Sequence, residues 1–287
     1  MKIPFAQIDA FADRPFTGNP AGVMPLEAWL ADDVLQAIAQ ENNLSETAFI
    51  VPTTGKADYE LRWHTPAAEV ALCGHATLAS GHHVLSRDTT RHHVTFQTRK
   101  SGILTVTRTG DGYELDLPAW VATPKPLPDI AAALGIASPD ATLWHDSGYA
   151  LIVVADEASV RALSPDLYAL RALGPIVAIV SAPGEKFDFV SRVFTPYFDI
   201  PEDPVTGSAH AVMVPYWAER LGRTQLTAFQ ASARGGNVTC RLEADRVVLG
   251  GTCVTVIEGS FTLQAATANS VGTVSSIQPP PMTRSPA

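Results

Sequence analysis

The sequence predicts an α+β fold built from two similar halves. The main evidence is a motif that occurs twice, at residues 62–70 (RWHTPAAEV) and 192–200 (RVFTPYFDI). The two copies lie 130 residues apart and share the arginine, the Thr-Pro pair, an acidic residue and an aliphatic residue. Each copy leads to a glycine that opens an apolar, helix-like stretch, Gly74 in the first and Gly207 in the second. Two halves that each present a helix start could build one site between them.

The first half, residues 1–121, combines strand and helix patterns. The apolar residues between 26 and 40 recur at helical intervals, so a helix is expected there. Residues 17–20 (TGNP) are typical of a turn. Apolar and β-branched runs predict strands at 47–51, 59–63, 103–107 and 113–117. The last two of these runs alternate apolar and polar residues and are separated by a Gly-Asp-Gly turn.

The second half, residues 129–260, repeats this order after a proline-rich linker at 122–128. A helix is expected at 158–172. Strands are expected at 150–154, 176–180, 187–193, 237–242 and 246–249. A final strand-like run at about 261–276 is a candidate for returning to the first half. The tail 278–287 has four prolines in ten residues and is expected to be disordered.

Composition excludes several classes of function. The net charge of −9 argues against nucleic acid or an anionic membrane as partner. An apolar fraction of 46% with 17% charged residues is typical of a globular protein with a large core. No stretch approaches the roughly 20 apolar residues that span a bilayer, and no secretory signal is evident, so a cytoplasmic protein is expected. The three cysteines are too few and too scattered for a disulfide framework.

The two glycine-led helices are the first candidates for a binding site. A helix N-terminus leaves backbone N–H groups unpaired and carries partial positive charge, which suits a carboxylate or phosphate. Gly74 and Gly207 would let a ligand approach the backbone closely. The alternative is that both glycines only serve tight strand-to-helix turns. Their duplication favours an anion site shared by the two halves.

Differences between the halves indicate where proton chemistry would occur. At the 130-residue offset, Glu46 falls opposite Ile176, so one copy places a carboxylate where the other has an apolar residue. A carboxylate partly removed from water can exchange protons near neutral pH. We therefore expect Glu46 to be a general acid/base, although an acidic residue at a strand start is often only a solvated end.

Three more polar residues surround the glycines. The second copy of the motif is followed by an insertion of three residues, 201–203, so Asp203 has no counterpart in the first half. Asp203 could either cap the helix or accept a hydrogen bond from a substrate. His75 follows Gly74 and faces Ser208, which follows Gly207. We expect substrate polarisation or proton transfer from His75 and hydrogen bonding from Ser208, since nothing in the sequence suggests an activating base for a serine nucleophile.

Cys73 precedes Gly74 and pairs with Thr206 across the halves. A cysteine at a helix start can be a base or nucleophile, but a small buried apolar role is equally consistent. We expect Cys73 and Thr206 to line the substrate site with the glycines. The histidine pairs 82–83 and 92–93 do not form a metal-ligand pattern, so no metal site is expected, and no nucleotide-binding motif occurs.

These residues resemble the PhzF family, over about residues 3–266. The resemblance is carried by the segments 9–11 (DAF), 18–23 (GNPAGV), 43–49 (NLSETAF), 65–66 (TP), 73–77 (CGHAT), 203–209 (DPVTGSA), 232–236 (SARGG) and 254–259 (VTVIEG). It implies a diaminopimelate epimerase-like fold of two pseudo-symmetric domains, each a curved, barrel-like, mainly antiparallel sheet around a central helix. It also implies a cleft between the domains, no cofactor, and a homodimer.

The family's namesake isomerises trans-2,3-dihydro-3-hydroxyanthranilate, and the resemblance assigns its acid/base glutamate to Glu46. It assigns the other site residues to His75, Asp203 and Ser208. Related racemases with two thiols carry a cysteine at each helix start, whereas this chain has Cys73 on one side only.

The leading hypothesis is a cofactor-independent isomerase of a small carboxylate, often amino-acid-like, with Glu46 moving the proton. One alternative is an epimerase that uses Glu46 and Cys73. The other is a small-anion binding protein without catalysis.

Overall fold

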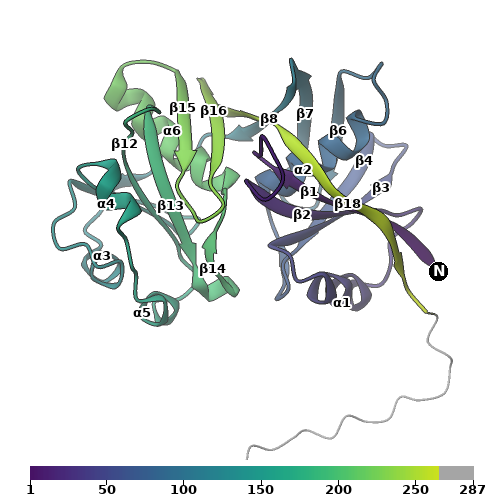
Figure 1. Cartoon of the computed structure of the whole chain (residues 1–287), viewed down its shortest axis with the longest axis horizontal. Coiled ribbons are helices and arrows are strands. Elements are labelled where there is room, and N and C mark those ends of the chain that lie inside the picture. Colours follow the sequence, from purple (N-terminus) through teal and green to yellow (C-terminus); the bar gives the residue numbers. More distant parts are fainter. Residues whose placement is uncertain (265–287) are drawn as a thin grey trace, which may run out of the picture.

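The computed structural model describes residues 1–264, and its two halves lie side by side (Figure 1). Each half is a curved, mainly antiparallel sheet around one helix, α2 (Gly74–Leu85) in the first and α6 (Gly207–Leu221) in the second. Both helices are buried over most of their residues, which explains why their sequences are apolar or small on every face. The predicted α+β fold of two similar halves is confirmed. The predicted tail 278–287 and most of the strand-like run 261–276 lie outside the described residues.

The elements of the first half follow the chain in order. They are β1 (Lys2–Ala10), β2 (Asn19–Pro25), α1 (Asp32–Asn42), β3 (Glu46–Pro52), β4 (Tyr59–His64), β5 (Glu69–Val70), α2, β6 (His93–Thr98), β7 (Ile103–Thr109) and β8 (Gly112–Pro118). The predicted hairpin is formed by β7 and β8. The predicted helix at 26–40 starts later than expected, at Asp32, because Leu26 still donates to Ile50 and extends the sheet.

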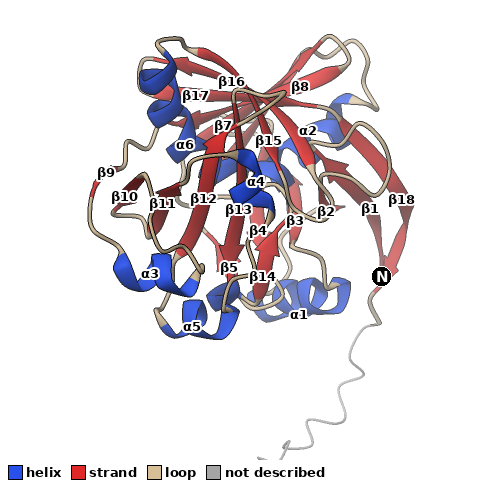
Figure 2. Ribbon diagram, turned by 60° about the vertical axis from the view of Figure 1, so that its left-hand side comes forward, coloured by secondary structure: helices blue, strands red, loops and turns tan. Residues whose placement is uncertain are grey.

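The second half repeats the pattern with shorter outer helices. Its elements are β9 (Thr123–Pro124), α3 (Pro128–Ala133), β10 (Ala141–His145), β11 (Tyr149–Val153), α4 (Glu157–Arg161), α5 (Leu167–Ala172), β12 (Val177–Pro183), β13 (Phe189–Thr195), the 3₁₀ turn η1 (Pro196–Phe198), β14 (Ile200–Asp203), α6, β15 (Gln225–Gln230), β16 (Gly236–Glu243), β17 (Arg246–Gly251) and β18 (Cys253–Thr262). Helices α1, α3 and α5 lie along one end of the molecule (Figure 2).

The helix predicted at 158–172 is wrong as a single element. It is interrupted between α4 and α5, where Pro165 lacks the N–H that a continuous helix needs. Each short helix has its own N-cap, since Asp156 accepts from Ser159 N and Asp166 accepts from Ala169 N. The apolar residues keep a helical spacing from α4 to α5, although Pro165 and the Asp166 cap end one helix and begin another, and this spacing produced the wrong prediction.

The end of the chain returns to the first half earlier than predicted. Strand β18 starts at Cys253, and it pairs antiparallel with β1 along its whole length. Residues 253–260, which the sequence analysis placed in the second half, therefore belong to the sheet of the first. The two sheets are further joined because β8 pairs antiparallel with β17.

Strand register defines which residues of the two halves correspond. Thr47 pairs with His64 in the first half, and Ala178 pairs with Phe194 in the second. With the shared motif superimposed, the counterpart of Glu46 is Val177. The prediction of Ile176 is wrong by one residue, because the strand pairing follows an offset of 131 rather than 130 at this point.

The same comparison moves the inserted residues. Trp63 pairs with Val70 on β5, and its equivalent Val193 pairs with Asp203 on β14. Asp203 therefore has a counterpart, Val70, and the three additional residues lie between Pro196 and Glu202 rather than at the predicted 201–203. Each half therefore has one carboxylate where the other half has an apolar residue. Glu46 of the first half corresponds to Val177, and Asp203 of the second half corresponds to Val70.

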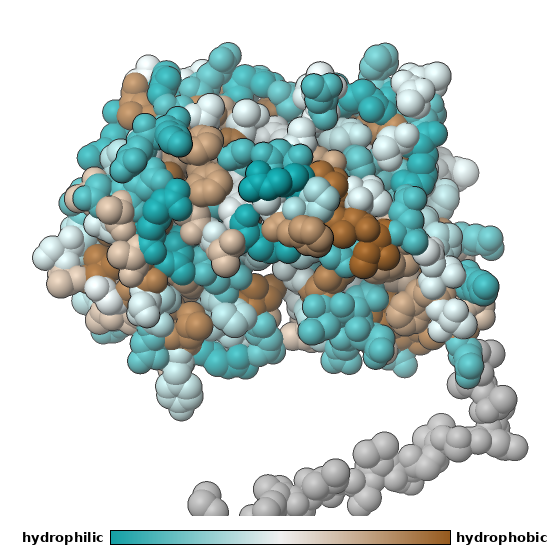
Figure 3. Space-filling model, viewed as in Figure 1, coloured by the Kyte–Doolittle hydropathy of each residue, from teal (hydrophilic) through white to brown (hydrophobic). Residues whose placement is uncertain are grey.

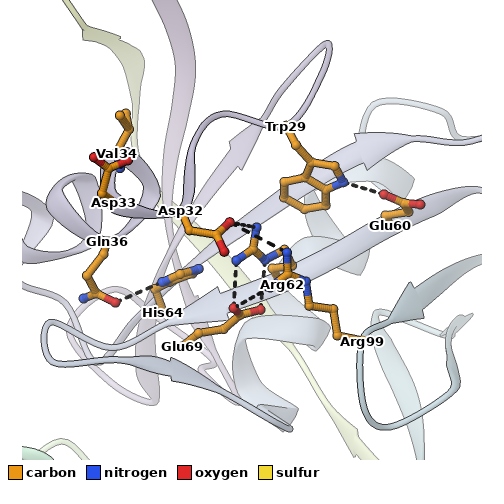
Figure 4. A network of polar contacts seen from close by, with 10 residues as sticks. All are labelled: Trp29, Asp32, Asp33, Val34, Gln36, Glu60, Arg62, His64, Glu69 and Arg99. Atoms are coloured by element: carbon orange, nitrogen blue, oxygen red, sulfur yellow. Dashed lines mark hydrogen bonds and ion pairs between the residues drawn. The ribbon is translucent and has the colours of Figure 1, made fainter.

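The repeated arginine is a structural clamp in both halves. Arg62 donates through Nε and Nη2 to the two oxygens of Glu69, at 2.8 and 2.7 Å, and it also reaches Asp32 (Figure 4). Arg192 holds Glu202 in the same bidentate geometry, at 2.8 and 2.9 Å. Each clamp ties the short strand that follows the Thr-Pro turn, β5 or β14, to the neighbouring strand. This fixes the segment that leads to the glycine of each central helix.

Candidate active site

A cavity of about 510 Å³ lies where the two central helices meet, and both halves line it. All eight predicted site residues contribute to its wall, and they are Glu46, Cys73, Gly74, His75, Asp203, Thr206, Gly207 and Ser208. A larger hollow of about 940 Å³ lies on the second half, around Asp188 and Arg241, and holds none of them. We place the candidate site in the smaller cavity because the residues predicted to transfer protons converge there.

The two helix N-termini touch each other through their glycines. A Cβ placed on Gly74 would lie 3.0 Å from the Cα of Gly207, and one on Gly207 would lie 2.9 Å from the Cα of Gly74. Among the described residues, neither N-cap residue, Cys73 or Thr206, caps its helix with a side-chain hydrogen bond. Two uncapped helix starts therefore open on the same cavity, an arrangement that favours a bound anion.

Glu46, Cys73 and His75 form one cluster on the side of the first half. Glu46 Oε2 lies 3.1 Å from His75 Nε2, and Cys73 Sγ lies 3.6 Å from His75 Nδ1. Glu46 Oε2 and His75 Nε2 are within ion-pair distance but are not aligned for a hydrogen bond. Among the described residues neither atom has a hydrogen-bond partner. Two buried polar atoms in this state are what a bound substrate would satisfy.

The charges in this cluster influence one another. Burial raises the pKa of the Cys73 thiol to about 11, and the nearby Glu46 adds to the rise, so the thiol is neutral near pH 7. Burial would lower the pKa of His75, but the neighbouring Cys73 and Glu46 outweigh this and raise that pKa well above its ordinary value. Because the thiol is neutral, we attribute the rise mainly to Glu46.

Asp203 lies on the other side of the cavity and belongs to a buried hydrogen-bond network. It accepts from Thr206 Oγ1 at 2.5 Å and from Asn19 Nδ2 at 2.7 Å. Asn19 Nδ2 also contacts Val205 O and His75 Nδ1, so this one amide joins the two halves. Burial raises the pKa of Asp203 to about 6, against the opposing effect of His75 and with a further rise from Glu46.

Ser208 contacts Tyr149, the residue at the start of β11. The Tyr149 hydroxyl donates to Ser208 Oγ at 2.8 Å. Burial raises the pKa of Tyr149 to about 12, although the bond to Ser208 lowers it, so the phenol keeps its proton at neutral pH. Tyr149 and Trp120 contact each other edge to face and both line the cavity.

Sequence reasoning missed two polar residues of this site. Asn19 was placed in a turn, but it begins β2 and is fully buried. Tyr149 lay one residue before the predicted strand 150–154. Its place in the site becomes visible only from the pairing of the strands. Tyr149 pairs with Val177, the counterpart of Glu46, and Glu46 pairs with Ala21.

Glu46, Cys73 and His75 are also close enough to hold a metal ion, since one ligand atom from each lies within 4.8 Å of the others. The Cys73 thiol, which holds its proton to about pH 11, would have to lose that proton when a metal ion binds.

In the part of the chain that the structure describes, no helix is long and apolar enough to cross a membrane.

Comparison with known proteins identifies the family. The sequence signature of the phenazine biosynthesis-like protein family matches residues 8–259. The chain belongs to this family. A protein of Pseudomonas aeruginosa described as an uncharacterized isomerase is 48% identical over 265 residues, which cover 92% of this chain and 100% of that protein.

Solved structures agree with this family assignment. A phenazine biosynthesis protein of the PhzF family from Enterococcus faecalis matches with a TM-score of 0.84 and 44% identity, covering 92% of this chain and 100% of that one. A hydroxyproline epimerase from Agrobacterium vitis shares the fold alone, with a TM-score of 0.61 and 10% identity over 92% of this chain and 94% of that one. The predicted family and the epimerase-like fold are confirmed, and the chain is an enzyme of the isomerase class.

Proposed function

We propose that this phenazine biosynthesis-like protein is a cofactor-independent isomerase that moves a proton within a small carboxylate, with Glu46 as the acid/base. The observation that carries the proposal is the one-sided placement of the base. Glu46 and its structural counterpart Val177 both line the cavity, so only the first half offers a carboxylate at this position. One base on one face suits removal and return of a proton by the same group.

The paired helix starts would hold the substrate carboxylate. The two helix starts meet at Gly74 and Gly207, and in the part of the chain that the structure describes neither N-cap side chain caps its helix. The same dipoles would stabilise the negative charge that develops when a proton leaves the carbon next to the carboxylate. The carboxylate therefore serves both for binding and for activation.

The remaining polar groups divide between the two sides of the substrate. His75, with its pKa raised well above the ordinary value by its surroundings, would share a proton with Glu46 and donate to the substrate. Asp203 would accept from a substrate hydroxyl or amine, and Ser208 would donate a hydrogen bond. A small amino-acid-like carboxylate provides groups for all of these partners.

The geometry argues against the alternative epimerase that uses Glu46 and Cys73. The ligand atoms of Glu46, Cys73 and His75 lie within 4.8 Å of one another, on one side of the cavity. Two bases acting on opposite faces of a carbon, each at a reacting distance of roughly 3 Å, would lie about 6 Å apart. The Cys73 thiol also holds its proton to about pH 11.

A homodimer in the cytoplasm remains part of the proposal. Apolar side chains gather on the half of the surface that carries β18, where Ile257 is 48% exposed (Figure 3). An exposed apolar patch on a soluble protein is typical of an interaction surface. Light scattering on the purified protein tests the dimer, and a monomeric mass at micromolar concentration would contradict it.

The proposed reaction is tested by a screen of small carboxylates in deuterium oxide, read by NMR. The wild-type protein is expected to incorporate deuterium at a carbon close to the carboxylate of at least one compound. Cys73→Ala should retain this activity within about tenfold, because a neutral thiol outside the reaction contributes only packing. Loss of all exchange in Cys73→Ala, with an unchanged melting temperature, would favour the epimerase, and no exchange with any compound would reject the proposal.

A further inference from the structure

The start of β11 carries a tyrosine where the other half has an alanine. Tyr149 pairs with Val177 in the parallel β11–β12 ladder, as Ala21 pairs with Glu46 in the β2–β3 ladder. The first half thus has a small residue beside a carboxylate, and the second has a phenol beside an apolar residue. Tyr149 is the polar group that the second half offers at this level of the cavity.

The hydrogen bond between Tyr149 and Ser208 has a preferred direction. The two oxygens are 2.8 Å apart, and the phenol is the stronger acid, so Tyr149 donates and Ser208 accepts. Among the described residues, Ser208 Oγ has no second hydrogen-bond partner, and the residue is only 7% exposed. The serine proton is therefore left free to point into the cavity, toward the place where a substrate oxygen would lie.

The tyrosine ring is held firmly enough to impose this direction. It packs edge to face against Trp120, with ring centroids 5.2 Å apart, and Trp120 stacks in turn on His145 at 5.2 Å. The Trp120 backbone N–H donates to Ala211 O, within helix α6, of which Ser208 is the second residue. The aromatic support and the helix that carries the serine are thus one packed unit.

We propose that Tyr149 is a positioning residue that commits Ser208 to donate its hydrogen bond to a carboxylate or carbonyl oxygen of the bound substrate. This inference rests on the proposed function for the identity of the ligand, a small carboxylate. In this proposal the second half supplies an oriented hydrogen-bond donor, Ser208, and the first half supplies Glu46, the residue that transfers the proton. Because the donor is already oriented before binding, the carboxylate binds without a cost for reordering the serine.

A neutron crystal structure of the protein in deuterium oxide tests the direction of the bond without any ligand. The deuteron of Tyr149 is expected between the two oxygens, with the deuteron of Ser208 directed into the cavity. The opposite arrangement, with the Ser208 deuteron between the oxygens and the tyrosine deuteron in the cavity, would overturn the proposal.

A double-mutant cycle tests the effect on binding, with the carboxylate that the wild type labels in deuterium oxide. Tyr149→Phe is expected to raise KM about tenfold when Ser208 is present and less than about twofold in a Ser208→Ala background, with kcat changed little in both. Tyr113→Phe is the matched control, since it removes a hydroxyl bonded to His82, a residue outside the cavity. Its KM should equal that of the wild type.

The outcomes separate this proposal from the proposed function. An equal loss on Tyr149→Phe in both backgrounds would mean that Tyr149 acts on packing and not through Ser208, while the isomerase proposal would stand. Absence of exchange with every carboxylate would reject the isomerase proposal, and the neutron structure would still decide the direction of the bond.

Discussion

Alanine at Gly74 or Gly207 would push apart the two helix starts that form the proposed anion site. The added Cβ would lie 3.0 Å from the opposite Cα in Gly74→Ala and 2.9 Å in Gly207→Ala, against an ordinary carbon–carbon contact of about 3.5–4.0 Å. The obstacle on each side is backbone, which cannot rotate away as a side chain can. Neither glycine has a positive φ, so the cost comes from the contact alone.

The expected destabilisation is that of an overpacked core, about 1–3 kcal/mol for each variant. A gain in helix propensity of up to about 1 kcal/mol offsets part of it. The net loss is then at most about 3 kcal/mol, and with a shift of about 2–4 °C per kcal/mol for a domain of 150–250 residues the melting temperature should fall by up to roughly 12 °C. The exchange rate should fall further, because the N–H groups of the two helices would no longer converge on one carboxylate.

Urea unfolding and the deuterium-exchange assay measure the two effects. Gly259→Ala on β18 is the matched control, because no atom of the described residues lies within 4 Å of its added Cβ and its φ is not positive. That variant should unfold and react like the wild type. If Gly74→Ala and Gly207→Ala were both as stable and as active as the control, the close contact of the helices would have no role in the site.

Three further predictions concern charges. Burial raises the pKa of Asp203 from 3.8 to about 6, so the wild type binds this proton more tightly when folded and loses stability as the pH rises from about 4 to above 6. Relative to the wild type, Asp203→Asn should therefore gain up to about 3 kcal/mol between pH 4 and 7 in urea unfolding, and a constant difference would contradict this. Arg62→Met should lower the unfolding free energy by about 2 kcal/mol, because the buried guanidinium bonds to Glu69 are lost, and a change below about 0.5 kcal/mol would argue against the clamp. Since the pKa of the Cys73 thiol is about 11, its alkylation by iodoacetamide at pH 7, followed by mass spectrometry, should be much slower than in urea, and equal rates would refute a protonated thiol.

Local patterns were sufficient to predict the two central helices and the strands with the clearest apolar runs, but not strands such as β1, β2, β14 and β15. The Gly74 and Gly207 helices could be placed because a glycine after a Thr-Pro motif and before an apolar run has few other interpretations. The return of the chain end to the first half was only a candidate, and neither its start at Cys253 nor its partner strand could be predicted, because Ile3 and Phe261 pair across almost the whole chain and nothing in either segment specifies its partner.

The errors within the site have similar causes. A one-residue difference in offset separates Val177 from Ile176, and both are β-branched apolar residues, so composition could not distinguish them. The position of the insertion was ambiguous because Asp199 and Glu202 are both acidic, and it takes the strand register and the bidentate bond to Arg192 to show that Glu202 corresponds to Glu69. These corrections retain the asymmetry between the halves and make it more specific.

The asymmetry itself is tested most directly by the rate of deuterium incorporation into the substrate carboxylate in Glu46→Gln. The change removes the only carboxylate that the Glu46–Val177 pair supplies while keeping the size of the side chain. The proposed mechanism predicts a loss of about 10²–10⁴-fold, with the melting temperature close to that of the wild type. An exchange rate equal to the wild type in a folded Glu46→Gln protein would show that the proton is moved by another group.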